Sequence, residues 1–245
     1  MNTVLFDLDG TLLPMDMQEF IETYVFLLKN RLISSGYDSD KIIESIWAGV
    51  NAVTKNSGMI TNEECFWRAF EDKYTGGVGK LESRFKRKLE KEMTKFYKED
   101  FGVARYIAHP LETVSECSDI LKETGYQIAV ATQPVFPEVA TRERIMWAGL
   151  NADDFALITT YENSCYAKPN LKYYEYILKT LDKDPEDCLM VGNDVGEDMC
   201  AKELGMDVFL LNTYEINTKN EDTYELKKGN WKVFKEYISN LPSLN

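Results

Sequence analysis

Histidine is almost absent from this chain of 245 residues, and the single one, His109, excludes a metal site built from several histidines. Cysteine occurs five times without a C-x-x-C pair, which indicates reduced thiols rather than a zinc site or a disulfide framework. No apolar run approaches the roughly 18 residues of a membrane span. No basic segment followed by an apolar stretch opens the chain. We therefore expect a cytoplasmic protein without a membrane partner.

Positive charge is scarce relative to negative charge. The chain has 28 Lys and Arg against 41 Asp and Glu, a formal net charge of −13. Such a surface repels polyanions, so nucleic acid is not expected as a partner. A small anionic ligand is still compatible, provided that its site supplies positive charge locally. Hydrophobic residues make up 44% of the chain, which is enough to bury a core and excludes disorder.

The region from about residue 15 to residue 100 has helical periodicity and no strand pattern. Hydrophobic residues recur at helical spacing in four stretches, separated by breaks near residues 34–36, 56–58 and 75–77. The glycine-rich residues 76–80 lack the first glycine and the final Ser or Thr of a phosphate-binding P-loop. We interpret them as a turn between two helices. The region is thus predicted to be a small helical bundle.

Short apolar strands alternate with amphipathic helices in the rest of the chain. The predicted strands are residues 3–6, 127–131, 155–159, 188–191 and 208–211. The predicted helices are residues 110–124, 137–148, 170–181, 195–204 and 231–239. This alternation is typical of a parallel sheet with helices on both faces. We predict an α/β protein, with a Rossmann-like core of residues 1–13 and 104–245 and an inserted α-helical cap domain of residues 14–103.

Polar side chains follow several of these strands, at the edge where an open parallel sheet binds its ligands. They comprise three carboxylates, one hydroxyl and one amine: Asp7, Asp9, Thr132, Lys168 and Asp194. Buried together, such groups make a poor core. Carboxylate oxygens are the ligands that Mg²⁺ prefers, and an ammonium group binds phosphate. The pattern therefore predicts a site for phosphate and a metal ion.

These residues closely resemble the motifs of the haloacid dehalogenase-like hydrolase superfamily. The matches are D-x-D-G-T at residues 7–11, the strand-end Thr132, the pair Lys168-Pro169 and the acidic segment of residues 193–198. They appear in the order of the family and span most of the chain. The helical insertion between the first two motifs resembles the subclass with an α-helical cap. The resemblance implies a hydrolase that acts on a small phosphorylated substrate with Mg²⁺.

The resemblance also implies a role for each matching residue. Asp7 would attack phosphorus and form an aspartyl-phosphate. Asp9 would first protonate the leaving oxygen and then take a proton from the hydrolytic water. Thr132 and Lys168 would bind the phosphoryl oxygens and offset their charge. Asp7, the backbone carbonyl of Asp9, and Asp194 would hold Mg²⁺.

Four further positions are implied to support the site or to bind phosphate: Thr11, Gln133, Asn193 and Asp198. Asp198 is expected to orient Lys168 or a metal-bound water. Gln133 stands where members of the family often have asparagine, which bears on substrate contacts. Asn193 precedes Asp194 where Gly-Asp is commoner, so it is either a neutral ligand near the metal or a turn residue. Asp194 itself could also cap the helix that follows it.

Two sets of residues near these motifs have simpler interpretations. Arg142 and Arg144 follow the second motif on a predicted helix, and we interpret them as part of a solvated face rather than as phosphate ligands. Aromatic residues of the cap are interpreted mainly as its core, with one or two facing the substrate. They are Phe20, Tyr24, Trp47, Phe66 and Phe70.

Three functions are compatible with this site. The first is a Mg²⁺-dependent phosphatase that acts on a small phosphorylated metabolite. The second is a sugar-phosphate phosphomutase with the same aspartyl-phosphate chemistry, because the difference lies in how the cap excludes water. The third is a binding protein that keeps the fold without activity, against which the complete motifs weigh. Asp9 argues against a dehalogenase, since that branch of the family lacks a carboxylate there. The sequence does not predict an oligomeric state.

Overall fold

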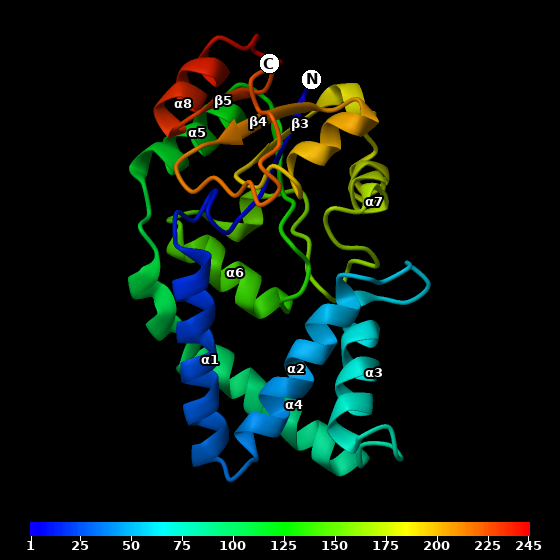
Figure 1. The fold of residues 1–245 in the computed structure, drawn as a ribbon. Coiled ribbons are helices and arrows are strands. Elements are labelled where there is room, and N and C mark those ends of the chain that lie inside the picture. The colour runs from blue at the N-terminus through cyan, green and yellow to red at the C-terminus, as the bar shows by residue number, and fades with distance from the viewer.

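The computed structural model describes residues 1–245 and contains one sheet of five parallel strands in the order β2-β1-β3-β4-β5 (Figure 1). The strands are β1 (Thr3–Phe6), β2 (Gln127–Val130), β3 (Cys188–Gly192), β4 (Asp207–Leu211) and β5 (Lys227–Gly229). The parallel sheet predicted from the sequence is therefore confirmed. β1 lies between β2 and β3, so the chain reverses its direction of winding beside β1.

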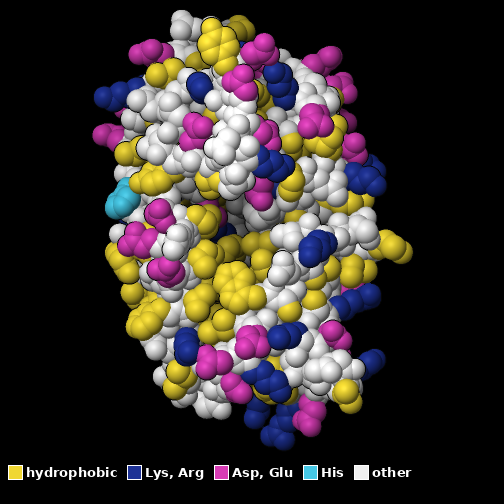
Figure 2. Space-filling model, viewed as in Figure 1, with side chains coloured by type: hydrophobic (Ala, Val, Ile, Leu, Met, Phe, Trp, Pro, Cys, Tyr) yellow, Lys and Arg dark blue, Asp and Glu magenta, His cyan; other side chains and the backbone are white.

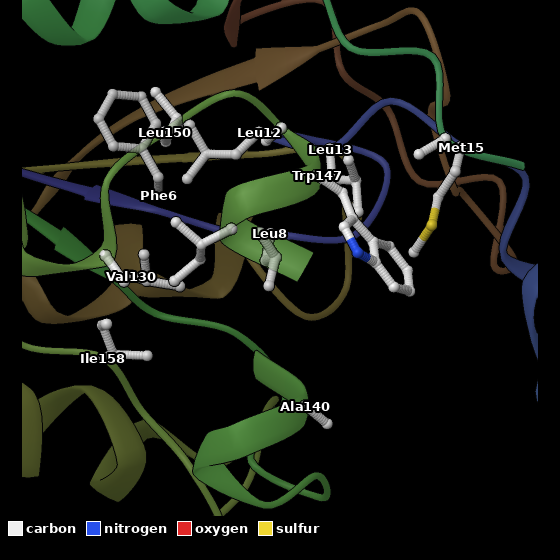
Figure 3. Packing of buried hydrophobic residues seen from close by; sticks show 14 of the residues in the cluster. Phe6, Leu8, Leu12, Leu13, Met15, Val130, Ala140, Trp147, Leu150 and Ile158 are labelled. Atoms are coloured by element: carbon white, nitrogen blue, oxygen red, sulfur yellow. The ribbon is translucent and has the colours of Figure 1, made fainter. Parts of the chain in front are cut away.

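Helices cover both faces of this sheet. The helices and 3₁₀ turns of the core are α5 (Glu112–Glu123), α6 (Glu138–Trp147), η2 (Ala152–Asp154), α7 (Leu171–Leu181), η3 (Pro185–Asp187), η4 (Met199–Leu204) and α8 (Trp231–Ser239). Successive residues of a strand point to opposite faces. Val4 and Phe6 accordingly belong to one buried cluster, with residues of α5 and α8, and Leu5 to another, with α7. Figure 3 shows Phe6 and Val130 in the same cluster as Trp147 of α6.

The segment between β1 and α5 contains helices and no strand, and these helices form the cap, as the sequence predicted (Figure 1). Its elements before α5 are α1 (Met17–Ser34), α2 (Ser39–Val53), α3 (Asn62–Thr75), α4 (Ser83–Glu99) and the 3₁₀ turn η1 (Phe101–Ile107). The first three helices each begin after a residue whose side chain accepts a backbone N–H of the first turn, namely Asp16, Asp38 and Thr61. No helix in the protein is long and apolar enough to cross a membrane.

The cap is attached to the core at Asn62 as well as through the chain connections at either end of the insertion. The backbone N–H of Asn62 donates to the Ser164 carbonyl at 2.7 Å. Its buried side-chain amide donates to the Tyr166 carbonyl at 3.0 Å and to the Pro134 carbonyl at 3.4 Å. Asn56 donates in turn to the Asn62 side-chain oxygen at 2.8 Å. The beginning of α3 is therefore held against two loops of the core.

The strand predicted at residues 155–159 is wrong. This segment runs beside β2 and exchanges backbone hydrogen bonds with Ile128 and Val130, but only Ile158 forms an isolated bridge. The side chain of Asn163 accepts the N–H of Thr160 and donates to the carbonyl of Ile158. Because a side chain takes these backbone groups, pairing with the sheet stops there.

The continuous helix predicted at residues 195–204 is also wrong, since only η4 forms within it. The side chain of Asp194 accepts the N–H groups of Gly196 and Glu197 and so shapes the preceding segment as a turn. The short strand β5 was not predicted. Its exposed lysines, Lys227 and Lys228, give no apolar alternation from which a strand could be recognised.

Candidate active site

The register of the sheet brings three of the motifs to one edge. Phe6, the last residue of β1, pairs with Val130 of β2 on one side and with Val191 of β3 on the other. Asp7 and Thr132 therefore emerge at the same carboxyl edge of the sheet, together with the segment that follows β3. This edge is where ligands bind in open parallel sheets.

Lys168 lies between two carboxylates at this edge. Its Nζ is 2.9 Å from Asp7 Oδ1 and 2.6 Å from Asp198 Oδ1, and its side chain is only 1% exposed. Burial alone lowers the pKa of a lysine, but the Asp198 and Asp7 carboxylates outweigh it and raise the pKa of Lys168 well above its usual value. Lys168 is therefore a fixed positive charge next to Asp7.

Gln133 holds the backbone of Lys168. Its side-chain oxygen accepts the Lys168 N–H at 3.1 Å, and its side-chain nitrogen donates to the Lys168 carbonyl at 3.2 Å. The same nitrogen donates to both carboxylate oxygens of Glu197, at 3.0 and 3.1 Å. Glu197 was not singled out from the sequence, although it lies within the acidic segment of residues 193–198. Burial raises its pKa to about 7.

Arg144 corrects the sequence-based interpretation. It is fully buried on α6 and donates from Nη1 to Asp9 Oδ2 and from Nε to the Ala140 carbonyl. Its guanidinium lies 4.3 Å from the ring centre of Phe136. Arg142, by contrast, is half-exposed as expected. Positions two apart on a helix point in nearly opposite directions, so one arginine faces solvent and the other faces the site. The missed signal was the apolar character of the face that carries Arg144.

Asp9 is buried beside Arg144, and one of its carboxylate oxygens has no hydrogen-bond partner. Burial raises the pKa of Asp9 above its ordinary value, although the Arg144 guanidinium opposes this shift. Oδ2 accepts from Arg144, while Oδ1 is buried without a hydrogen-bond partner. An unpaired buried oxygen is costly in a merely structural position. Its presence here is understandable if Oδ1 serves a substrate or a transferred proton.

Thr11 and Asn193 join the first motif to the last. The Thr11 hydroxyl donates to Asn193 Oδ1 at 2.9 Å, and Asn193 Nδ2 donates to the Tyr214 carbonyl at 2.6 Å. Gly10 has a φ of +84°, and a Cβ at this position would lie 2.5 Å from Asn193 Nδ2. Glycine is therefore required in this turn. Both side chains are fully engaged within the protein and hold the two loops together.

Asp194 and Asp198 organise the loop after β3. Asp194 Oδ1 accepts the N–H groups of Gly196 at 2.8 Å and Glu197 at 2.9 Å and so forms a turn. The capping alternative is wrong, because no helix begins after Asp194. The Asp194 N–H donates to Asp198 Oδ2 at 3.0 Å, and the other Asp198 oxygen binds Lys168. A Cβ on Gly192 would collide with the Asp198 carboxylate. Asp198 thus ties this loop to Lys168.

Thr132 has a fixed backbone and a free hydroxyl. Its N–H donates to Thr159 Oγ1 at 3.0 Å, and its carbonyl accepts from Thr159 Oγ1 at 2.9 Å and from the Tyr173 hydroxyl at 2.8 Å. The Thr132 hydroxyl has no hydrogen-bond partner within the chain. A rigid backbone with an unused hydroxyl at the strand end is suited to binding an oxygen of a ligand.

The donor groups predicted for Mg²⁺ are of the chemical kind that this ion prefers. No three or more His, Cys, Asp or Glu side chains form a group that could hold a metal. The predicted set is smaller: two carboxylates, Asp7 and Asp194, and the backbone carbonyl of Asp9. That carbonyl accepts no backbone hydrogen bond. All three donors are oxygens, and Mg²⁺ usually keeps several waters. The residues therefore fit the ion, with water completing its coordination.

The sheet, its helical insertion and this cluster define a hydrolase of the haloacid dehalogenase-like class. A family model described as "Hydrolase: haloacid dehalogenase-like hydrolase" matches residues 1–205, and the chain belongs to this family. In sequence, the chain is similar to a glyceraldehyde 3-phosphate phosphatase of Methanocaldococcus jannaschii. The two are 26% identical over 206 residues, which are 83% of this chain and 81% of that protein.

Solved structures share the fold over nearly their whole length. A 2-haloacid dehalogenase from Pseudomonas syringae pv. Tomato superimposes with a TM-score of 0.65 at 19% identity, covering 98% of each chain. The HAD-hydrolase YfnB from Bacillus subtilis, bound to magnesium, superimposes with a TM-score of 0.58 at 15% identity. That match covers 97% of this chain and 98% of YfnB. At these identities the likeness establishes the fold alone.

Proposed function

We propose that the protein is a Mg²⁺-dependent phosphatase that hydrolyses a small phosphorylated metabolite through an aspartyl-phosphate on Asp7. The observation that carries this proposal is the buried cluster at the carboxyl edge, where Lys168 Nζ lies 2.9 Å from Asp7 Oδ1 and 2.6 Å from Asp198 Oδ1. The family and the phosphatase relative from M. jannaschii support it. The five cysteines are all free, in keeping with a cytoplasmic enzyme.

In the first half of the reaction, Asp7 attacks phosphorus and the bond from phosphorus to the leaving oxygen breaks. Lys168 occupies Asp7 Oδ1, so Oδ2 is the oxygen without a partner in the chain. Two unit charges about 4 Å apart at an effective dielectric of 20 repel by about 4 kcal/mol. Lys168 reduces this repulsion between the carboxylate and the phosphate. The free hydroxyl of Thr132 donates to a phosphoryl oxygen.

Asp9 moves the proton in both halves of the reaction. Its raised pKa favours the protonated form that donates to the leaving oxygen. Arg144 holds Oδ2, so Oδ1 is the oxygen that carries the proton. In the second half a water attacks phosphorus, Asp9 takes the proton of that water, and the bond to Asp7 breaks to release phosphate. Arg144 is thus a positioning residue that was not found from the sequence.

Asp7, the Asp9 carbonyl and Asp194 would hold the Mg²⁺ ion, and the structure of YfnB, which shares the fold, is bound to magnesium. When bound, the ion would neutralise charge on the phosphate and so assist its approach to Asp7. The Glu197 N–H donates to Asp194 Oδ1, and its carboxyl, with a pKa raised to about 7 by burial, is only partly charged near neutral pH.

The test is release of inorganic phosphate by the purified protein from a panel of phosphorylated metabolites, with and without Mg²⁺. The panel includes glyceraldehyde 3-phosphate, the substrate given in the name of the relative from M. jannaschii. We expect turnover that disappears with EDTA and returns with Mg²⁺. Conversion of a sugar phosphate to its isomer without phosphate release would identify a phosphomutase instead. Absence of turnover on every substrate would contradict both.

A further inference from the structure

A cavity of about 130 Å³ lies between the cap and the core, and phosphate chemistry does not account for it. Residues of α1, α2, α3 and α4 line it from the cap, while Val135, Phe136 and Tyr161 line it from the core. Figure 2 shows hydrophobic side chains gathered over the cap, beside a hollow between the two halves of the molecule. The cavity is thus bounded by both domains.

The lining of this cavity has no charge and little hydrogen-bonding capacity. Eighteen of its 19 lining residues are hydrophobic, and none is Asp, Glu, Lys or Arg. The hydroxyls of Tyr24 and Tyr97 bond each other at 2.9 Å, so neither is left unpaired. Burial raises the pKa of Tyr24 to about 12, which keeps the phenol neutral. A ligand hydroxyl placed here would lose its bonds to water with little replacement.

Phe136 links the wall of the cavity to the catalytic edge. This residue forms part of the cavity wall, and its ring packs against the Arg144 guanidinium at 4.3 Å from the ring centre. Arg144 in turn binds Asp9. Phe136 also lies only four positions after Thr132 in the same loop. Phe136 and Arg144 therefore connect the apolar cavity to Asp9, which acts on the leaving group.

We infer that the substrate is a phosphomonoester whose organic group is apolar, about the size of one aromatic ring or a chain of about six carbons. This rests on the proposed phosphatase function. An apolar protein cavity of about 150 Å³ holds one benzene ring, so 130 Å³ fits a group of that size. Sugar phosphates and the three-carbon glyceraldehyde 3-phosphate would place hydroxyl or carbonyl oxygens where the protein offers them few partners.

Primary alkyl phosphates from ethyl to octyl provide the test, because their leaving groups differ in apolar length and hardly at all in chemistry. We expect kcat/KM to rise about fourfold per methylene, equivalent to about 0.8 kcal/mol, and to level off near six carbons. Propyl phosphate should be hydrolysed at least about tenfold better than glycerol 1-phosphate, which has the same three carbons and two hydroxyls. Thermal shifts with ethyl- and hexylphosphonate report the same preference without turnover.

Variants at Val50, which lines the cavity from α2, locate the effect. Val50→Phe fills the cavity and should lower the hexyl-to-ethyl ratio of kcat/KM at least about tenfold. Val50→Ala enlarges it and should move the optimum to longer chains. The matched control is Val78→Phe in the turn after α3, where Val78 is 82% exposed. This variant should leave the ratio unchanged.

The outcomes separate this inference from the proposed function. If phosphate esters are hydrolysed without dependence on chain length, or glycerol 1-phosphate is preferred to propyl phosphate, the cavity is a packing void and the inference is overturned, while the phosphatase function stands. If no ester is hydrolysed and neither phosphonate shifts the melting temperature, the proposed function fails and the inference falls with it.

Discussion

The core and the cap both contain arginine–carboxylate pairs, yet in opposite places. In the core, Arg144 and Asp9 are buried together at the sheet edge. In the cap, Arg31 of α1 binds Glu92 of α4 where both side chains keep some contact with solvent, at 17% and 13% exposed, and no charged side chain lines the cavity. A buried charge that loses its partner has no water to replace it, whereas a surface charge does. The core is thus built for chemistry, and the cap for contact with an apolar group.

The largest effect is expected at the core nucleophile. Asp7→Asn removes the attacking carboxylate and should reduce kcat by at least about a thousandfold. Steady-state phosphate release measures this, and the melting temperature reports the fold. Asp207→Asn is the matched control, because Asp207 pairs with Lys227 at the exposed start of β4. An Asp7→Asn variant that kept substantial activity would remove Asp7 as nucleophile.

Lys168→Ala should lower kcat/KM by about a hundredfold to a thousandfold, because a fixed cation next to the phosphate is lost. The change also leaves Asp7 and Asp198 facing each other, so the free energy of unfolding should fall by about 3–5 kcal/mol. Activity is therefore assayed well below the melting temperature of the variant. Lys179→Ala, at the exposed end of α7, is the control. Unchanged kcat/KM would exclude Lys168 from the reaction.

Arg144→Met tests whether the buried arginine positions Asp9. We expect kcat to fall about tenfold to a hundredfold with little change in KM, because Asp9 loses its orientation while the phosphate ligands stay in place. Arg144→Lys should recover part of the activity. Arg142→Met, two positions away on the solvated side of α6, should have no effect. A rise in KM alone would instead mean that Arg144 contacts the substrate.

The smallest effect is expected on stability, at the partly exposed Arg31–Glu92 pair of the cap. Hydrogen bonds from Ser35 and Arg31 lower the pKa of Glu92 below its ordinary value of 4.5. A lowered pKa in the folded state adds stability above pH 4.5, and that stability is lost as the pH falls through the folded-state value. Glu92→Gln should therefore cost about 1 kcal/mol or less at pH 7 and progressively less in acid. Urea unfolding at several pH values measures this.

Glu90→Gln on the same helix is the control, since Glu90 is more exposed and lies 3.8 Å from Lys86. It should change stability less than Glu92→Gln at pH 7. If Glu92→Gln lowered the free energy of unfolding by several kcal/mol, the pair in the cap would be as sensitive to loss of a partner as the buried pair in the core, and the comparison would fail.

Most of the core could be predicted from the sequence because strong local signals agree with the tertiary structure. Apolar strands end at polar motifs, and a parallel sheet collects such ends at one edge. Prediction failed where a single polar side chain decides the outcome, as Asn163 does by ending the pairing of residues 155–159. The roles of the site residues are still predictions, although the structure places Asp7, Lys168 and Asp198 in contact.

The cap could be predicted only in part. Helical spacing correctly predicted that Tyr24 and Phe70 point inward, whereas Trp47, interpreted in the same way, is 41% exposed. It did not show that the four helices leave a cavity, because that depends on how they pack against each other and against the core. Arg144 was missed for a related reason. An arginine on a predicted helix was expected to be exposed to solvent, whereas the side chain of Arg144 on α6 faces the site.

The anchorage of α3 at Asn62 limits how a substrate can reach this interior. In Figure 1 the chain enters and leaves the cap on one side, while the beginning of α3 meets the core on the other. A rotation of the cap away from the core about the two chain connections would have to break the hydrogen bonds from Asn62 to Ser164 and Tyr166. A tilt about Asn62 would spare them and open a slot on one flank, through which flat or slender molecules pass more easily than branched ones.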